Sequence, residues 1–184
     1  MAPHCRTLLY YPIQKNKLLA YPKNRSDLSH LLFDLEERNY DSLDDTTRHD
    51  ISHIASDPHH PNIVAATGEG DRNLKTFDAT TDNLQSCIKL SNKATLLRFD
   101  PHHTDSMAYA AGDYIRIINP FTGDQYAALK HKAPIIDFDF NPHKPYELLV
   151  TQKNGETVKW TQQSTPYSSL RNTIHFLKTG KFKK

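Results

Sequence analysis

The stretch Asp57-Pro58-His59-His60 decides the fold, because it returns twice further along the chain. The second copy is Asp100-Pro101-His102-His103, and the third, in altered form, is Asn141-Pro142-His143-Lys144. The prolines of the three copies lie 43 and 41 residues apart. A motif that recurs at a nearly fixed period of this length indicates a repeat architecture.

A second landmark closes a strand-like run in each repeat: an apolar residue followed by a short polar one. The pairs are Phe33-Asp34, Phe77-Asp78, Ile118-Asn119 and Trp160-Thr161. Their polar members stand at positions 34, 78, 119 and 161, which gives spacings of 44, 41 and 42 residues. Four landmarks on one period predict four structural repeats that end near these positions.

The local pattern within a repeat is that of strands. Ahead of the third proline, Ile136, Phe138 and Phe140 alternate with Asp137 and Asp139, which is the period of two of a half-buried strand. Each proline-containing turn is followed by an apolar run, a turn with Gly, Asp or Asn, and a third strand. In the best-formed repeat these lie at 107–111, 112–113 and 114–118, and the linking segment supplies a fourth strand, most clearly at 125–129.

Residues 27–37 allow two interpretations. Leu28, Leu31, Leu32 and Leu35 have the spacing of one face of a helix. The phase of the repeat instead makes 31–34 the third strand of an N-terminal sheet. We expect the strand.

Four antiparallel strands in ~40–45 residues, closed by a Trp-Asp-like pair, are typical of the WD-repeat propeller blade. We therefore predict an all-β fold, a partial WD-repeat β-propeller of about four four-stranded sheets over 1–166, followed by a basic, flexible tail over 167–184. The last repeat offers members of the hydrogen-bond network of a full blade, with Asn154 in place of an Asp; they are His131, Thr151 and Trp160.

The length of the chain limits the number of blades. Seven blades of ~40–45 residues need roughly 280 to 315 residues, and the chain has 184. We expect that another chain, a second copy or further sequence completes the propeller. The alternative is a closed ring of four blades, at the bottom of the range of ~4–8. An open arc is expected to expose apolar sheet faces with residues such as Ile136, Phe138 and Phe140.

Four stretches carry a resemblance to a known family: 30–39, 50–56, Leu97-Arg98-Phe99-Asp100-Pro101-His102-His103 and Asp137-Phe138-Asp139-Phe140-Asn141-Pro142-His143-Lys144-Pro145-Tyr146. They resemble the WD-repeat family of proteins that interact with the endosome-associated and Golgi-associated retrograde tethering complexes. These segments follow the order of the family and span about residues 18–162. The family's full propellers have about seven blades. The resemblance implies a non-enzymatic adaptor in endosomal recycling and Golgi retrograde trafficking. It would be cytoplasmic, associated with Golgi and endosomes through partners such as subunits of a retrograde tethering complex.

The histidines of the repeated turns suggest a metal site or a pH-sensitive rim; they are His59, His60, His102, His103 and His143. Metal ligands must converge within ~2–2.2 Å of one ion, whereas equivalent turns on adjacent blades lie much farther apart. Histidine titrates near endosomal pH, which leaves the pH-sensitive rim as a weaker hypothesis. We expect these residues to serve the turns and to bind no metal.

Three further patterns resemble catalytic motifs. Asp137 and Asp139 could be paired carboxylates, but their alternation with phenylalanines favours the polar side of a strand. The stretch 68–71 is glycine-rich and lacks the Gly-Lys-Ser/Thr of a phosphate loop, and Ser168 and Ser169 lie in no nucleophile motif. We therefore predict neither catalytic residues nor a cofactor, and the partner-binding residues remain unassigned.

Charge and composition leave one alternative open. The net charge is +2, and the two cysteines, Cys5 and Cys87, make no disulfide framework. No apolar run approaches the ~20 residues of a membrane-spanning helix, and the N-terminus lacks a signal-peptide core, so we expect a cytoplasmic protein. Arg171 and the lysines of 178–184 keep open a WD-repeat protein of a nucleic-acid-associated assembly, such as ribosome biogenesis. The near-neutral body favours the protein-interaction scaffold.

Overall fold

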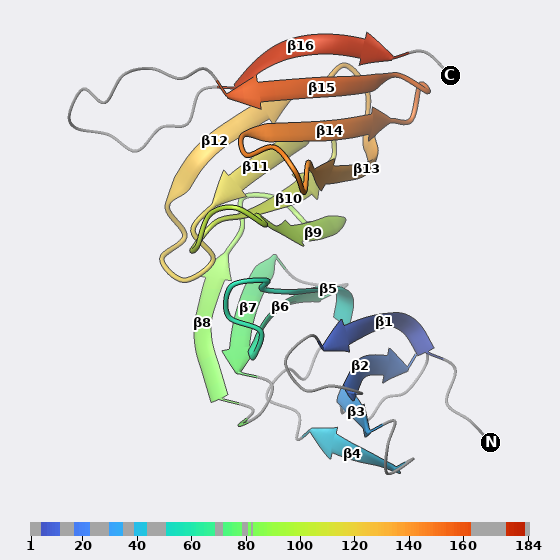
Figure 1. The fold of residues 1–184 in the computed structure, drawn as a ribbon, viewed down its shortest axis with the longest axis vertical. Helices are drawn as coiled ribbons and strands as arrows, with labels where there is room; N and C mark the ends of the chain where they lie inside the picture. The colour runs from blue at the N-terminus through green and yellow to red at the C-terminus, as the bar shows by residue number, and fades with distance from the viewer. Residues whose placement is uncertain are drawn as a thin grey trace. The chain divides into compact units, whose positions relative to one another are not determined.

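The computed structural model describes residues 5–11, 17–22, 30–34, 39–43, 51–68, 72–78, 81, 83–162 and 176–182. Within these ranges the chain forms sixteen β-strands and no helix, which confirms the predicted all-β fold. The strands form four-stranded antiparallel sheets, in which each strand pairs with the next one along the chain (Figure 1). The chain divides into two compact units, Met1–Lys93 and Ala94–Lys184, and each holds two of these sheets.

The first unit contains the sheets β1–β4 and β5–β8. The strands of the first sheet are β1 (Cys5–Tyr11), β2 (Lys17–Pro22), β3 (His30–Asp34) and β4 (Asn39–Leu43). Those of the second are β5 (Ile51–Ser56), β6 (Ile63–Gly68), β7 (Asn73–Asp78) and β8 (Asn83–Lys89). The first strands of the two sheets, β1 and β5, lie against each other. The strand predicted at 31–34 is confirmed as β3, so the helical interpretation of these residues is wrong.

The second unit repeats this plan. One sheet consists of β9 (Leu96–Phe99), β10 (Met107–Ala111), β11 (Tyr114–Ile118) and β12 (Gln125–Lys130). The other consists of β13 (Ile135–Phe140), β14 (Glu147–Gln152), β15 (Thr157–Gln162) and β16 (Phe176–Phe182). The first strands, β9 and β13, are again neighbours. Repeated four-stranded meanders, adjacent within each unit through their first strands, are consistent with a partial propeller.

The core of the second unit lies between its two sheets. The sheet β9–β12 contributes small and branched side chains of three strands, and the sheet β13–β16 contributes larger ones; together they are Ala108, Ala110, Ile115, Ile117, Ala127, Leu129, Ile135, Phe138, Phe140, Leu148 and Val150. Burial of a Leu, Ile or Phe side chain stabilises by about 1.5–3 kcal/mol. This cluster therefore holds the two sheets of the unit together.

Strand β13 corrects the expected apolar face. Phe138 and Phe140 are buried in the core cluster, and Asp137 and Asp139 are exposed, so the predicted alternation is confirmed for these four residues. Ile136, however, is 54% exposed, while Ile135 is buried. The pairing of β13 with β14 shifts between Ile135 and Asp137, and an extra residue at such a bulge reverses the side-chain direction. The open face of the sheet β13–β16 therefore does not carry the two phenylalanines.

The C-terminal segment also differs from the prediction. Of the expected flexible tail over 167–184, residues Phe176–Phe182 form β16, the fourth strand of the last sheet. It pairs with β15 in register from Thr157↔Phe182 to Gln162↔Phe176, with one shift near Trp160. The first three strands of this sheet leave one edge of β15 with unpaired main-chain groups, and β16 satisfies them. These seven residues thus belong to the repeat architecture.

Candidate functional site

The repeated Asp-Pro-His-His motif forms the same turn between the first and second strands of its sheet. In one copy, the Oδ1 of Asp57 accepts a hydrogen bond from the main-chain N–H of His59 at 2.8 Å, and its Oδ2 lies 3.0 Å from Nδ1 of His60. In the next copy, the Oδ1 of Asp100 accepts from the N–H of His102 at 2.9 Å, and its Oδ2 lies 2.9 Å from Nδ1 of His103. A carboxylate only accepts, so each Nδ1 donates.

The third copy keeps the turn with a different set of bonds. Asn141 Oδ1 accepts from the N–H groups of His143 and Lys144 at 2.9 and 3.2 Å. Its Nδ2 donates to Oε2 of Glu147 at 3.0 Å, a bond that an aspartate could not make. An Asp or Asn side chain that caps the main chain two or three residues later is the chemistry that favours these residues at turns. The motif is therefore structural in all three repeats.

One histidine of the motif also joins neighbouring sheets. His102 Nε2 lies 2.8 Å from the main-chain oxygen of Asn141, 39 residues further along the chain. The carbonyl oxygen can only accept, so Nε2 donates. The bond ties the turn of the sheet β9–β12 to the turn of the sheet β13–β16. The bond therefore adds to the core cluster in holding these two sheets together.

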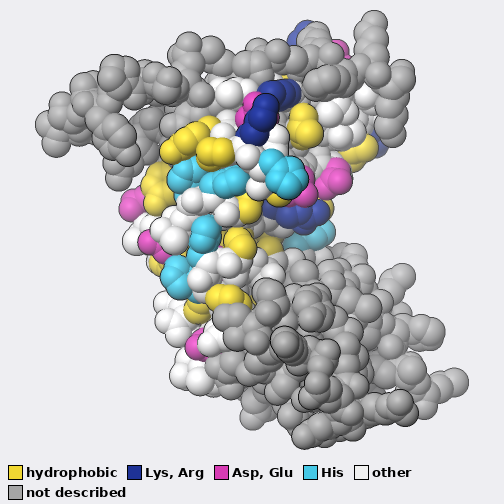
Figure 2. All heavy atoms as spheres, viewed as in Figure 1, with side chains coloured by type: hydrophobic (Ala, Val, Ile, Leu, Met, Phe, Trp, Pro, Cys, Tyr) yellow, Lys and Arg dark blue, Asp and Glu magenta, His cyan; other side chains and the backbone are white. Residues whose placement is uncertain are grey.

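The same two turns display an aromatic contact. The ring of His103 lies 4.5 Å from the ring of Tyr146, measured between centroids. Tyr146 is 45% exposed and has a φ of 66°, a left-handed conformation that is uncommon for a bulky residue. Asp105, at the equivalent position before β10, has a φ of 55°. In Figure 2, histidine side chains gather among hydrophobic ones on the face of the second unit that carries these turns.

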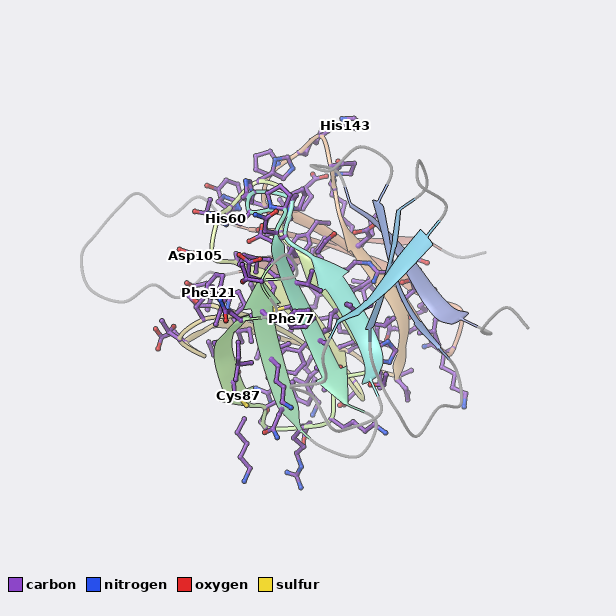
Figure 3. The ribbon with its side chains drawn as sticks, turned by 90° about the horizontal axis from the view of Figure 1, so that it is seen from below. His60, Phe77, Cys87, Asp105, Phe121 and His143 are labelled. Carbon is purple, nitrogen blue, oxygen red and sulfur yellow. The ribbon has the colours of Figure 1, made fainter. Side chains whose placement is uncertain are left out.

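The third histidine-bearing turn points outward. His143 is exposed and lies at the outer tip of the turn between β13 and β14 (Figure 3). Across the part of the chain that the structure describes, no three His, Cys, Asp or Glu side chains are grouped so that they could hold a metal ion. The hypothesis of a pH-sensitive rim stays untested.

The network expected in the last repeat forms only in part. The rings of His131 and Trp160 meet edge to face, with centroids 5.5 Å apart. Thr151 instead lies near Thr157, with their hydroxyl oxygens 3.2 Å apart, and Asn154 Oδ1 accepts from the N–H of Glu156. The cause is the strand direction: Thr151 and Thr157 are cross-strand partners and share a face.

A buried glutamine stands beside this network, and sequence reasoning missed it. Gln152 is fully buried, and its Oε1 accepts from the N–H groups of Lys132 and Ala133 at 3.0 and 3.1 Å. It thereby holds the segment that leads from β12 into β13. A polar residue at the end of the apolar run 148–150 was the available signal.

The two aspartates that resemble a catalytic pair bond to the main chain of their own strand. Asp137 Oδ1 accepts from the N–H of Phe138 and lies 3.6 Å from a guanidinium nitrogen of Arg98, and Asp139 Oδ1 accepts from the N–H of Phe140. Both side chains are exposed, as the alternation predicted. Residues 69–71, 168 and 169 lie outside the described residues. Cys87 is a free, exposed cysteine on β8.

One ion pair has a clear electrostatic effect. Lys159 Nζ lies 2.6 Å from Oε1 of Glu147, across β14 and β15. The hydrogen bond from Lys159 lowers the pKa of the Glu147 carboxyl below its usual value, and the bond from Asn141 adds to this effect. Both partners of Glu147 favour its ionised form.

A comparison of the chain with protein-family models and with curated proteins finds no match. Among the described residues, no helix is long and apolar enough to cross a membrane.

Proposed function

We propose that this protein is a non-enzymatic scaffold of WD-type repeats that mediates interactions between proteins. The observation that carries the proposal is a constant turn with changing displayed residues. The Asp or Asn caps of the three turns are equivalent. In each copy the N–H of the capping residue donates, at 2.9 Å, to the carbonyl oxygen of the residue that begins the second strand or directly precedes it. The exposed residues of the turns differ, with Thr104 and Asp105 in one copy and Lys144, Pro145 and Tyr146 in the next.

A fixed frame that presents different side chains from repeat to repeat is the property that repeat proteins use for binding. Tyr146 supports this interpretation. The equivalent position of the preceding turn holds Asp105 in the same left-handed conformation, so the turn itself does not need an aromatic side chain, yet Tyr146 presents one that is 45% exposed. We propose the turn 141–147 as the centre of the binding surface.

The resemblance to the proteins that interact with retrograde tethering complexes supports a finer proposal. In it, the partners are subunits of such a complex, and the protein acts at endosomes and the Golgi from the cytoplasm. The turns at 100–103 and 141–146, which carry the resemblance, are the turns that lie side by side in the second unit through the bond between His102 and Asn141.

Affinity purification of the tagged protein followed by mass spectrometry tests both levels of the proposal. We expect tethering-complex subunits to co-purify with the parent protein and to be depleted for the double variant Lys144→Ala with Tyr146→Ala. Leu84→Ala on β8 is the control, since Leu84 is similarly exposed at 49% and belongs to the first unit rather than to the turn 141–147. If other proteins co-purify with the parent and are depleted for the double variant, the scaffold proposal stands and the tethering-complex partner is rejected. Ribosomal RNA with assembly factors would favour the nucleic-acid-associated alternative.

A further inference from the structure

The outer face of the last sheet carries a row of three side chains with an acid, an apolar residue and a base. Asp139 of β13 pairs with Leu149 of β14, and Leu149 pairs with Lys159 of β15. Direct cross-strand partners point to the same face of a sheet. The three strands lie side by side in Figure 1, so the row runs straight across the sheet. From the row and its exposure, we infer that this face binds the same face of a second copy of the chain.

This face is opposite the core cluster and open. Leu148 and Val150, the sequence neighbours of Leu149, are fully buried in the cluster, whereas Leu149 itself is 43% exposed. The equivalent position in the sheet β9–β12 is Ala108, which is fully buried between the two sheets. The equivalence follows from the bonds that close the two turns, Asp100 N–H to Ser106 and Asn141 N–H to Glu147. Leu149 thus stands on the open face, at the position where Ala108 of the preceding sheet packs against the next sheet.

The charges of the face select a second copy as the occupant. Asp137 has Arg98 as a cationic neighbour and Glu147 has Lys159, whereas Asp139 takes part in no ion pair of the described residues. A surface that carries both an acid and a base on opposite sides of an apolar residue is complementary to itself under a two-fold rotation. The second copy brings a lysine to Asp139 and an aspartate to Lys159.

The row also fixes the direction of the two-fold axis. With an axis along β14, Leu149 meets Leu149 of the second copy, and each Asp139 lies over Lys159 of the other copy. With an axis across the strands, β13 faces β13 and acids meet acids, which is unfavourable. The pairing therefore places the two sheets face to face with β14 over β14.

The size of the face makes the association weak. Six-residue strands at ~3.3 Å per residue and four strands at ~4.8 Å give a footprint of roughly 20 by 15 Å. This is well below the ~800 Å² that each partner buries in a stable interface of standard size. We expect a dimer that forms only at high protein concentration and weakens as added salt screens the ion pairs.

Sedimentation velocity of the full chain, over about 10 to 500 µM in low salt, tests the inference. The parent should shift from monomer toward dimer, and Leu149→Lys should raise the dissociation constant at least about tenfold because it brings two cations together at the axis. Leu84→Lys on β8 is the matched control and should dimerise like the parent. A parent that remains monomeric throughout, or a Leu149→Lys variant that dimerises unchanged, overturns the inference.

Charge exchange tests the two-fold pairing itself. Asp139→Lys alone should weaken dimerisation. The double variant Lys159→Glu with Glu147→Lys should weaken it as well; this double variant reverses the charge at position 159 and keeps an ion pair between positions 147 and 159. A mixture of the two variants should form a heterodimer with a dissociation constant within about threefold of the parent. No recovery in the mixture overturns the symmetric pairing.

A chemical cross-link provides a readout without charge changes. Leu149→Cys in a Cys5→Ser, Cys87→Ser background should be linked to its own copy by a bismaleimide that reaches about 10 Å, the separation of packed sheets. Leu84→Cys in the same background should not be linked. Equal linking of both variants, or of neither, counts against the inference. The inference does not rest on the proposed function, since the tethering partner and the second copy are detected in separate experiments.

Discussion

Replacing Asp100 by alanine tests the structural role of the repeated motif. The carboxylate of Asp100 accepts two hydrogen bonds, from the N–H of His102 and from Nδ1 of His103, each at 2.9 Å. The residue is only 7% exposed, so water replaces these bonds poorly. A hydrogen bond to a charged group contributes about 1.5–3 kcal/mol, and loss of an analogous capping side chain at a helix start costs about 1 kcal/mol. The His103 side chain is 34% exposed and can bond to water once the carboxylate is removed, so we expect Asp100→Ala to lower the free energy of unfolding by about 2 kcal/mol.

Asp100→Asn separates the cap from the charge. Asparagine keeps an oxygen that accepts from the N–H of His102, as Asn141 does for His143 in the third repeat. We expect this variant to lose less than about 1 kcal/mol, because the bond that changes is the one to His103. Asp105→Asn is the matched control in the same turn. Asp105 is exposed and has a positive φ that asparagine tolerates, so we expect no measurable loss.

Urea unfolding followed by circular dichroism measures these differences, with equal slopes required for a valid comparison. The expected order of stability is parent and Asp105→Asn first, Asp100→Asn next and Asp100→Ala last. Asp57→Ala repeats the test in the first unit, where Asp57 makes the equivalent bonds to His59 and His60. If Asp100→Asn were as damaging as Asp100→Ala, or Asp100→Ala lost less than about 0.5 kcal/mol, the assignment of the motif to turn capping would be wrong.

Three further outcomes follow from the sheet β13–β16. Leu148→Ala should cost about 2–5 kcal/mol in urea unfolding because its side chain is fully buried, while Leu149→Ala should cost less than about 1 kcal/mol; similar losses would contradict the register of β14. Tyr146→Gly should be about 1 kcal/mol more stable than Tyr146→Ala, because both lose the ring and only glycine adopts a φ of 66° without strain; an equal stability would argue against that conformation. Lys159 lowers the pKa of Glu147 in the folded state, so the ion pair stabilises the fold at pH values above the unfolded-state pKa of Glu147. Glu147→Gln should therefore lower the thermal midpoint at neutral pH. The difference should disappear as the pH falls through that lowered pKa, and a difference that persists in acid would exclude the ion pair as its cause.

The local chemistry of the chain could be predicted from the sequence, because it depends on neighbouring residues. The strand at 107–111 has the predicted bounds in β10, and that at 114–118 has them in β11. The alternation in 137–140 and the role of the histidine-bearing turns as turns are also as expected. Proline restricts φ, aspartate caps the next main-chain amides, and apolar residues of a half-buried strand recur every two positions. Repetition at a period of about 42 residues made these short signals reliable.

Tertiary structure decided what depends on the position of a residue relative to another sheet. The bulge that exposes Ile136 and buries Ile135 reflects pairing with β14 and packing on the core cluster, and no local pattern encodes it. Strand β16 forms because β15 leaves main-chain groups to satisfy, although its sequence has a basic composition that resembles a solvated tail. The bond from His102 to the carbonyl of Asn141 and the row from Asp139 through Leu149 to Lys159 join residues between 10 and 39 positions apart. Sequence determines which side chains can cap, pack or pair, but only the pairing of strands and the packing of sheets bring such distant side chains together.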